Sequence, residues 1–259
     1  MKLAVLQMNP NLGQVQENIG RARAIVHNRI GELQNLDVLV LPEMIFSGYV
    51  FKSRAEIEPF LEDPSDRESP SIQFAIDMAR SLDAYVACGF PERSGANAYN
   101  SQFIAAPGGS QAHVYRKHFL YETDEAWAQE GDAFESYQLG SLGKAGSGIC
   151  MDLNPYRFQT PFEDFEFANA MRKANVELLL LSMNWIAHES WNLKEELLAY
   201  WKLRLYPLRG KSCIAAIANR TGTERDIRFA GCSCVIDLKR NTVLASLDEE
   251  EEALLVCEI

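Results

Sequence analysis

The chain has 259 residues, of which 47% are hydrophobic and 24% charged, a composition typical of globular proteins and unlike that of disordered or fibrous chains. Lysine and arginine number 25 against 36 aspartate and glutamate residues, so the formal net charge is −11. Because a nucleic-acid phosphate backbone selects a basic surface, we expect no nucleic-acid partner, and we expect neutral or cationic substrates instead.

The first segment, MKLAVLQMNP, predicts a strand and not a secretion signal, because its apolar run stops at Gln7. No apolar run approaches the roughly 18 residues that cross a bilayer, so we expect no membrane partner. Six scattered cysteines without a secretion signal favour free thiols in the reducing cytoplasm. Cys232 and Cys234 are interpreted as strand residues that face opposite sides, and we expect no metal and no organic cofactor.

Strand-like segments alternate with segments of helical periodicity along the first half of the chain. A Pro-Gly-Gly turn between two apolar segments is typical of a hairpin. In chain order, the expected elements are a strand at 3–7, a helix with apolar positions from 19 to 33, a buried strand at 38–41, a helix from about 71, a strand at 85–89, and a hairpin of 101–106 with 111–116.

The second half repeats this alternation in outline. Its expected elements are a strand that ends at 149, a helix at 166–174, a strand at 178–181, a helix at 193–205, and strands at 213–218, 229–237, 243–246 and 253–259. No linker rich in Ser, Gly or Pro separates the halves, so residues 1–259 are expected to form one domain. We predict an α/β fold in which two sheets stack face to face under outer helices, a four-layer αββα sandwich.

Three predicted strands end in residues that can do chemistry. Glu43 follows the strand 38–41, Lys117 follows the hairpin, and Cys150 follows a Gly-Ile pair. A thiol nucleophile needs a proton acceptor and a group that stabilises an oxyanion, which Glu43 and Lys117 can supply. Taken singly, each has an ordinary structural interpretation as an ion pair, a helix cap or a small buried side chain.

The four histidines lie in no recognisable base motif. We interpret His27 as a helix residue and His113 as a strand residue. Lys117 and His118 are neighbours at a strand end, so only one of them can face the site.

In the order Glu43, Lys117, Cys150, these residues and their surroundings resemble the carbon–nitrogen hydrolase (nitrilase) superfamily. The resemblance covers nearly the whole chain, through the segments LAVLQMNPNLGQVQEN, LPEMIFSGY, YNSQFIAAPGG, YRKHFLY, GICMDLNPY, ELLLLSMNW and FAGCSCVID. It implies the αββα fold and an amidase reaction. It also implies that Glu43 is the base, that Cys150 is the nucleophile, and that Lys117 with the backbone N–H of Met151 holds the oxyanion.

Within the superfamily, YRKHFLYETDEAW and GICMDLNPYRF resemble the branch that deamidates N-terminal Asn and Gln of proteins to Asp and Glu, which feeds the N-degron pathway. Small-molecule amidases of the superfamily commonly carry an aromatic residue after the cysteine, where Met151 stands here. The implied partners are protein N-termini that begin with Asn or Gln. A monomer and a homodimer both remain open.

Further substrate-binding residues follow from this resemblance. A second acidic residue is usual after the lysine, and counting back from Gly131 gives Asp124, which can equally be a loop cap. Asp124 and Asp152 are our candidates for the substrate's α-ammonium group, because a carboxylate recognises it best. Trp185 and, more weakly, Tyr49 are candidate pocket walls.

Two alternatives remain at this point. A small-molecule ω-amidase, or an amidase of deaminated glutathione, would act on free dicarboxylic monoamides and not on peptides. A catalytically idle binding module would be expected to have lost one of Glu43, Lys117 and Cys150, all of which are present.

Overall fold

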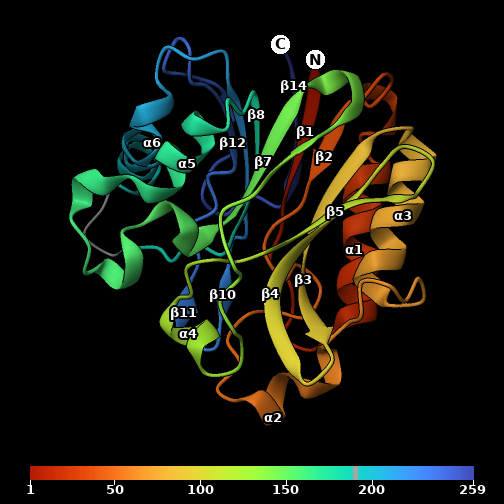
Figure 1. Cartoon of the computed structure of the whole chain (residues 1–259). Helices are drawn as coiled ribbons and strands as arrows, with labels where there is room; N and C mark the ends of the chain where they lie inside the picture. Colours follow the sequence, from red (N-terminus) through yellow and green to blue (C-terminus); the bar gives the residue numbers. More distant parts are fainter. Residues whose placement is uncertain (189–191) are drawn as a thin grey trace.

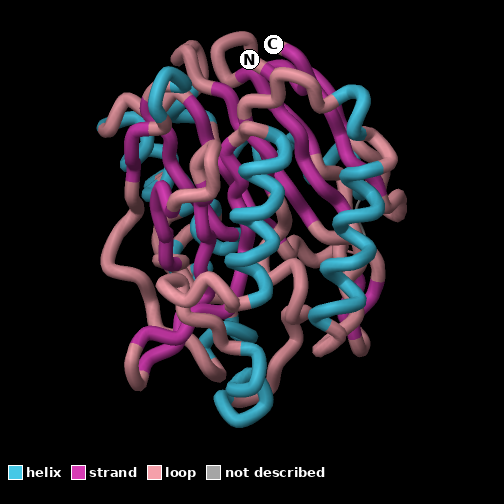
Figure 2. The backbone as a smooth tube through the Cα atoms, turned by 90° about the vertical axis from the view of Figure 1, so that its right-hand side faces the viewer, coloured by secondary structure: helices cyan, strands magenta, loops and turns pink. Residues whose placement is uncertain are grey.

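The computed structural model describes residues 1–188 and 192–259, and it consists of two stacked sheets with helices outside (Figure 1). The first sheet has the strand order β14-β1-β2-β3-β4-β5, and the second has the order β13-β12-β9-β8-β7-β6. Helices α1 and α3 cover the first sheet, and α5 and α6 cover the second, so the four-layer prediction is confirmed. Figure 2 shows α1 and α3 side by side on the outer face.

The strands of the first sheet are β1 (Lys2–Gln7), β2 (Val38–Val40), β3 (Tyr85–Ser94), β4 (Asn97–Ala105), β5 (Gln111–Arg116) and β14 (Ala253–Glu258). Those of the second are β6 (Ser136–Gln138), β7 (Lys144–Ile149), β8 (Leu178–Met183), β9 (Ile214–Asn219), β12 (Cys234–Asp237) and β13 (Thr242–Ser246). The short strands β10 (Thr223–Glu224) and β11 (Ile227–Arg228) form a separate hairpin.

The α-helices are α1 (Val15–His27), α2 (Arg54–Ile57), α3 (Pro70–Leu82), α4 (Glu122–Glu125), α5 (Glu166–Lys173) and α6 (Leu193–Arg204). Short 3-10 turns lie at 30–32, 58–60, 140–142, 150–153, 156–158, 162–164 and 206–208. Among the described residues, no helix is long and apolar enough to cross a membrane.

The centre of each sheet is parallel, which explains why its strands are mostly buried. β1, β2 and β3 run parallel in one sheet, and β7, β8 and β9 run parallel in the other. Each sheet packs against helices on one face and against the other sheet on the second face, so these strands are buried on both sides. The carboxyl ends of β2, β7 and β8 lie at the same edge of the sandwich. β7 and β8 pair parallel, and the side chains of Ser182 and Asn184 at the end of β8 donate to the carbonyls of Leu41 and Glu43 after β2.

Three element boundaries differ from the predictions. The helix predicted from 19 to 33 ends at His27, and the segment 30–32 forms a separate 3-10 turn. β3 continues to Ser94 through Pro91, which lowers strand propensity in a sequence pattern but pairs here opposite Asn100.

The strand predicted from Phe229 begins only at Cys234, because Gly231 and Cys232 have positive φ. Cys232 and Cys234 pack in the same core cluster, so the opposite-facing prediction for them is wrong. Residues two positions apart on a strand share a face, so the alternation of side chains does not separate this pair.

Candidate active site

Glu43 is placed by a tight turn after β2. Met44 adopts a φ of 44°, unusual for a residue with a side chain, and Glu43 itself is fully buried. Gly89 on the neighbouring strand β3 makes this turn possible. A Cβ at Gly89 would lie 2.6 Å from the Glu43 Cα and 2.6 Å from the Pro42 carbonyl oxygen.

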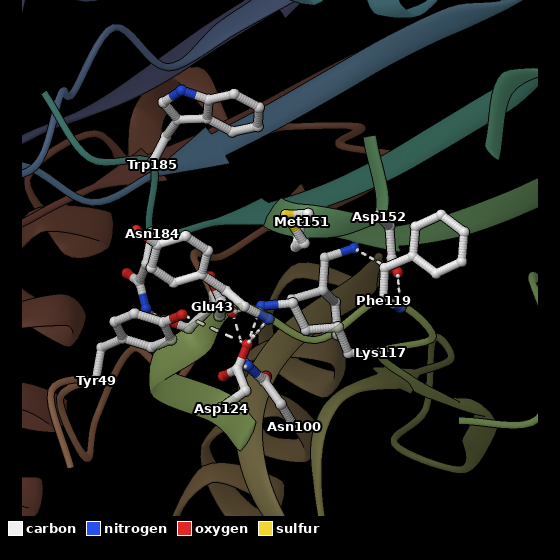
Figure 3. A network of polar contacts seen from close by, with 12 residues as sticks. Glu43, Tyr49, Asn100, Lys117, Phe119, Asp124, Met151, Asp152, Asn184 and Trp185 are labelled. Atoms are coloured by element: carbon white, nitrogen blue, oxygen red, sulfur yellow. Dashed lines mark hydrogen bonds and ion pairs between the residues drawn. The ribbon is translucent and has the colours of Figure 1, made fainter. Parts of the chain in front are cut away.

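Lys117 and Glu43 form a buried ion pair, and both side chains are fully inaccessible. The Lys117 Nζ lies 2.8 Å from the Glu43 Oε1 and 2.5 Å from the Asp124 Oδ2. Asn100 completes this cluster, because its Nδ2 donates to Glu43 Oε1 at 2.6 Å and to Asp124 Oδ1 at 2.9 Å. Figure 3 shows the four side chains pointing toward one another.

The cluster sets the protonation of its members. Burial raises the pKa of Glu43 to about 7, against the opposing charge of Lys117. Burial opposes the charge of Lys117, but Asp124 and Glu43 outweigh it and raise the pKa of this amine above its ordinary value. Lys117 therefore remains an ammonium group at neutral pH, whereas Glu43 titrates near neutrality.

Cys150 begins a 3-10 turn directly after β7 and has a φ of 41°. This strained conformation brings the thiol to the cavity, a placement common for functional residues. Burial and the Glu43 charge raise the pKa of the thiol, whereas Lys117 and a hydrogen bond from the Asn184 backbone N–H lower it. The thiol therefore keeps its proton at neutral pH and needs a base.

Asp152 holds the nucleophile turn together. Its carboxylate accepts hydrogen bonds from the backbone N–H groups of Ile149, His118 and Phe119 at 2.8–3.1 Å and from the Tyr115 hydroxyl at 2.8 Å. Asp152 is fully buried. The bonds tie the turn after β7 to the segment after β5, so Cys150 and Lys117 are fixed relative to each other.

A cavity of about 320 Å³ opens above Cys150. The residues that line it are mostly apolar or aromatic: Tyr49, Tyr121, Cys150, Met151, Asn154, Phe158, Asn184, Trp185, Ile186, Ala187, His188 and Tyr200. No carboxylate is among the described residues of this lining. Such a cavity accepts one small side chain and its attached backbone.

The structure places the predicted residues in two groups. Tyr49, Met151 and Trp185 line the cavity beside Cys150. Asp124 and Asp152 do not line it, and donors within the protein already occupy their carboxylate oxygens. This argues against the prediction that either carboxylate binds the substrate's ammonium group, because both are fully buried outside the cavity lining.

Asp124 instead supports Lys117 from behind, and it also accepts the Tyr121 backbone N–H at 3.0 Å, so it is a loop cap as well. The side chain of His118, the residue after Lys117, points away from the active site. Its Nδ1 lies 2.6 Å from the Gly131 carbonyl oxygen, next to the rings of Phe119 and Phe134.

Two polar residues of the site were not singled out from the sequence. Asn100 lies on β4, across the hairpin from Lys117, and the Lys117 N–H donates to its carbonyl at 2.8 Å. Asn184 follows β8 as Glu43 follows β2, and its Nδ2 donates to the Glu43 carbonyl at 3.0 Å. Their positions could have identified both residues, because each places a polar side chain at the same edge of the sandwich.

A thiol beside a buried carboxylate–ammonium pair, on stacked α/β sheets, defines a cysteine hydrolase. The family model "Carbon-nitrogen hydrolase" matches residues 2–259, and the chain belongs to this family.

The chain is 37% identical to "Protein N-terminal amidase" of Schizosaccharomyces pombe, over 100% of this chain and 99% of that protein. It is 33% identical to "Protein N-terminal amidase" of Saccharomyces cerevisiae over 76% of this chain, which is 47% of that protein. A crystal structure of N-terminal amidase with an Asn-Glu peptide has the same fold, with a TM-score of 0.89 at 21% identity over 100% of this chain and 97% of that chain.

Proposed function

We propose that this chain deamidates N-terminal Asn and Gln residues of proteins to Asp and Glu through a thioester on Cys150. The observation that carries the proposal is the fully buried Glu43–Lys117 pair beneath a small cavity that exposes Cys150. The full-length identity of 37% to a protein N-terminal amidase supports the choice of substrate. The reaction takes place in the cytoplasm, and its products enter the N-degron pathway.

In the acylation half, Glu43 accepts the thiol proton as the sulfur attacks the carboxamide carbon. The Lys117 ammonium and the Met151 backbone N–H stabilise the charge that develops on the carbonyl oxygen. The C–N bond then breaks, the proton passes from Glu43 to the leaving nitrogen, and ammonia departs.

In the deacylation half, Glu43 takes a proton from a water molecule, whose oxygen attacks the thioester carbon. The C–S bond breaks, and the sulfur regains its proton from Glu43. The product leaves as a carboxylic acid, which ionises in water, and the enzyme returns to its initial state.

The charge of the cluster favours a substrate with a free α-ammonium group. The cluster beneath the cavity holds two carboxyl groups, Glu43 and Asp124, against one ammonium group, Lys117. A positive group on the substrate offsets this charge in a low-dielectric site. We assign Tyr49, Met151 and Trp185 to contact with the first residue of the substrate.

Ammonia release tests the proposal. Short peptides with N-terminal Asn or Gln are compared with their N-acetylated forms and with free glutaramate, for the wild type and Cys150→Ala. Release from the free-amine peptides only, and its loss in the variant, is the expected result. Release from glutaramate alone would establish a small-molecule amidase instead, and no release from any substrate would favour a binding module.

A further inference from the structure

A chain of buried hydrogen bonds crosses the interface between the two sheets. Ser147 on β7 donates to the Gln102 Oε1 at 2.5 Å, and the Gln102 Nε2 donates to the Ser182 Oγ at 2.7 Å. Ser182, on β8, in turn donates to the Leu41 carbonyl at 2.7 Å. Gln102 and Leu41 belong to the first sheet and the serines to the second, so each of these bonds joins the two sheets.

Each polar side chain in this series of hydrogen bonds has a partner, and each bond has an assigned donor and acceptor. The Tyr137 hydroxyl lies 2.7 Å from the Ser147 Oγ and donates to it, because the one Ser147 hydroxyl proton is donated to Gln102. Gln102, Ser147 and Ser182 are all completely buried. An unpaired polar group in a buried site costs free energy. The network therefore favours one relative position of the two sheets over positions that are slightly shifted from it.

The rest of the interface gives little positional information. Many of its other buried side chains are apolar, and several are small, such as Ala87, Ala145, Ala216 and Ala218. Apolar burial is non-directional, and a surface of small side chains offers few ridges to interlock. The hydrogen bonds of Gln102, Ser147 and Ser182 therefore supply directional contacts between the sheets, beside the bond from the Asn184 side chain to the Glu43 carbonyl and the bond from the Ser233 N–H to the Gln7 side chain.

Each member lies next to a residue of the active site. Leu41 is two residues before Glu43, Gln102 is two residues after Asn100, and Ser147 is three residues before Cys150. Glu43 and Lys117 come from the first sheet and Cys150 from the second, so the distance between base and nucleophile depends on how the sheets sit on each other.

We propose that Gln102 is a positioning residue, which with Ser147 and Ser182 fixes the register of the two sheets and so holds Glu43 against Cys150. The proposal rests on the proposed catalytic roles of these two residues. A misplacement of 1 Å can cost about 100-fold in rate, so a small slip of one sheet has a measurable effect.

The test compares two buried serines. Ser182→Ala removes a hydroxyl that accepts one bond and donates one bond between the sheets. Ser233→Ala is the matched control, because this hydroxyl accepts from the Asn219 N–H at 2.9 Å and donates to the Asn219 carbonyl at 3.1 Å, within one sheet. Gln102→Met is the third variant and replaces the amide by an apolar group of similar length.

We expect Ser182→Ala and Ser233→Ala to lower the melting temperature by similar amounts. Only Ser182→Ala and Gln102→Met should lower kcat, by tenfold or more, with KM within twofold of the wild type. The rate of Cys150 alkylation by iodoacetamide at pH 7.5 should fall in parallel, because Glu43 no longer takes the thiol proton efficiently. The alkylation rate does not depend on which amide is the substrate. A failure of the positioning proposal can therefore be distinguished from a failure of the proposed function.

Equal effects of the two serine variants on kcat and on alkylation would overturn the proposal, as would a Gln102→Met enzyme with wild-type kcat. If Gln102→Met yields no folded protein, the comparison of the serine variants decides alone.

Discussion

Gly89→Ala is expected to damage the site through the backbone alone. The added Cβ would lie 2.6 Å from the Glu43 Cα and 2.7 Å from the Met44 nitrogen, whereas ordinary contacts begin at 3.4 Å. The Glu43 turn must therefore move by about 0.8 Å, because the clashing atoms are backbone and cannot rotate away. A displacement of this size at the proposed base predicts a loss of about 100-fold in kcat/KM. Overpacking of this kind also costs about 1–3 kcal/mol of unfolding free energy.

The assay is steady-state ammonia release at a temperature well below the melting transition of the variant, measured beside thermal unfolding. Gly20→Ala on α1 is the control, because no atom lies within 4 Å of the added Cβ. Its helix should become more stable by up to about 1 kcal/mol while kcat/KM stays unchanged. A Gly89→Ala enzyme with wild-type kcat/KM would refute the reasoning, since it would show that Glu43 need not stay where this strand holds it.

Three further predictions concern protons and donors. Because the proposed base Glu43 accepts a proton only as a carboxylate and its pKa is raised to about 7, kcat/KM should fall as the pH drops below 7, which a pH–rate profile measures. Asn100→Leu removes a hydrogen bond that favours the charged form of Glu43, so the acidic limb of that profile should move to higher pH; an unmoved limb would contradict this assignment. Tyr115→Phe removes one of the donors to buried Asp152 and should lower the unfolding free energy by about 1.5–3 kcal/mol in urea titrations, with KM within twofold.

The residues of the site that could be predicted from the sequence are those that follow predicted strands. All-apolar segments of four to six residues predict strands buried on both faces, and parallel strands end at one edge of a sheet. Glu43 follows such a strand. Cys150 follows β7, whose sequence KAGSGI is not all apolar, and reaches the same edge because β7 pairs parallel with β8. Lys117 joins them because the hairpin of β4 and β5 returns to the same edge.

The unpredicted part depends on turns whose conformation the sequence pattern does not encode. Cys150 has a φ of 41°, and the 3-10 turn that follows directs Asp152 into backbone N–H groups and away from the cavity. A carboxylate two residues after the nucleophile is compatible with both orientations. The same holds for Asp124, whose oxygens are taken by Lys117 and Asn100, two residues that approach it only in the folded chain.

The electrostatics of the site keep its proton on sulfur until a substrate is bound. Burial raises the pKa of both the Cys150 thiol and the Glu43 carboxyl, so desolvation alone does not drive proton transfer between them. Lys117 stays charged because Asp124 and Glu43 flank it, and its charge is placed to act on an oxyanion once one forms. In the proposed reaction, thiolate formation is thus coupled to attack on the carbonyl, which limits side reactions of an exposed thiolate when the cavity holds no amide.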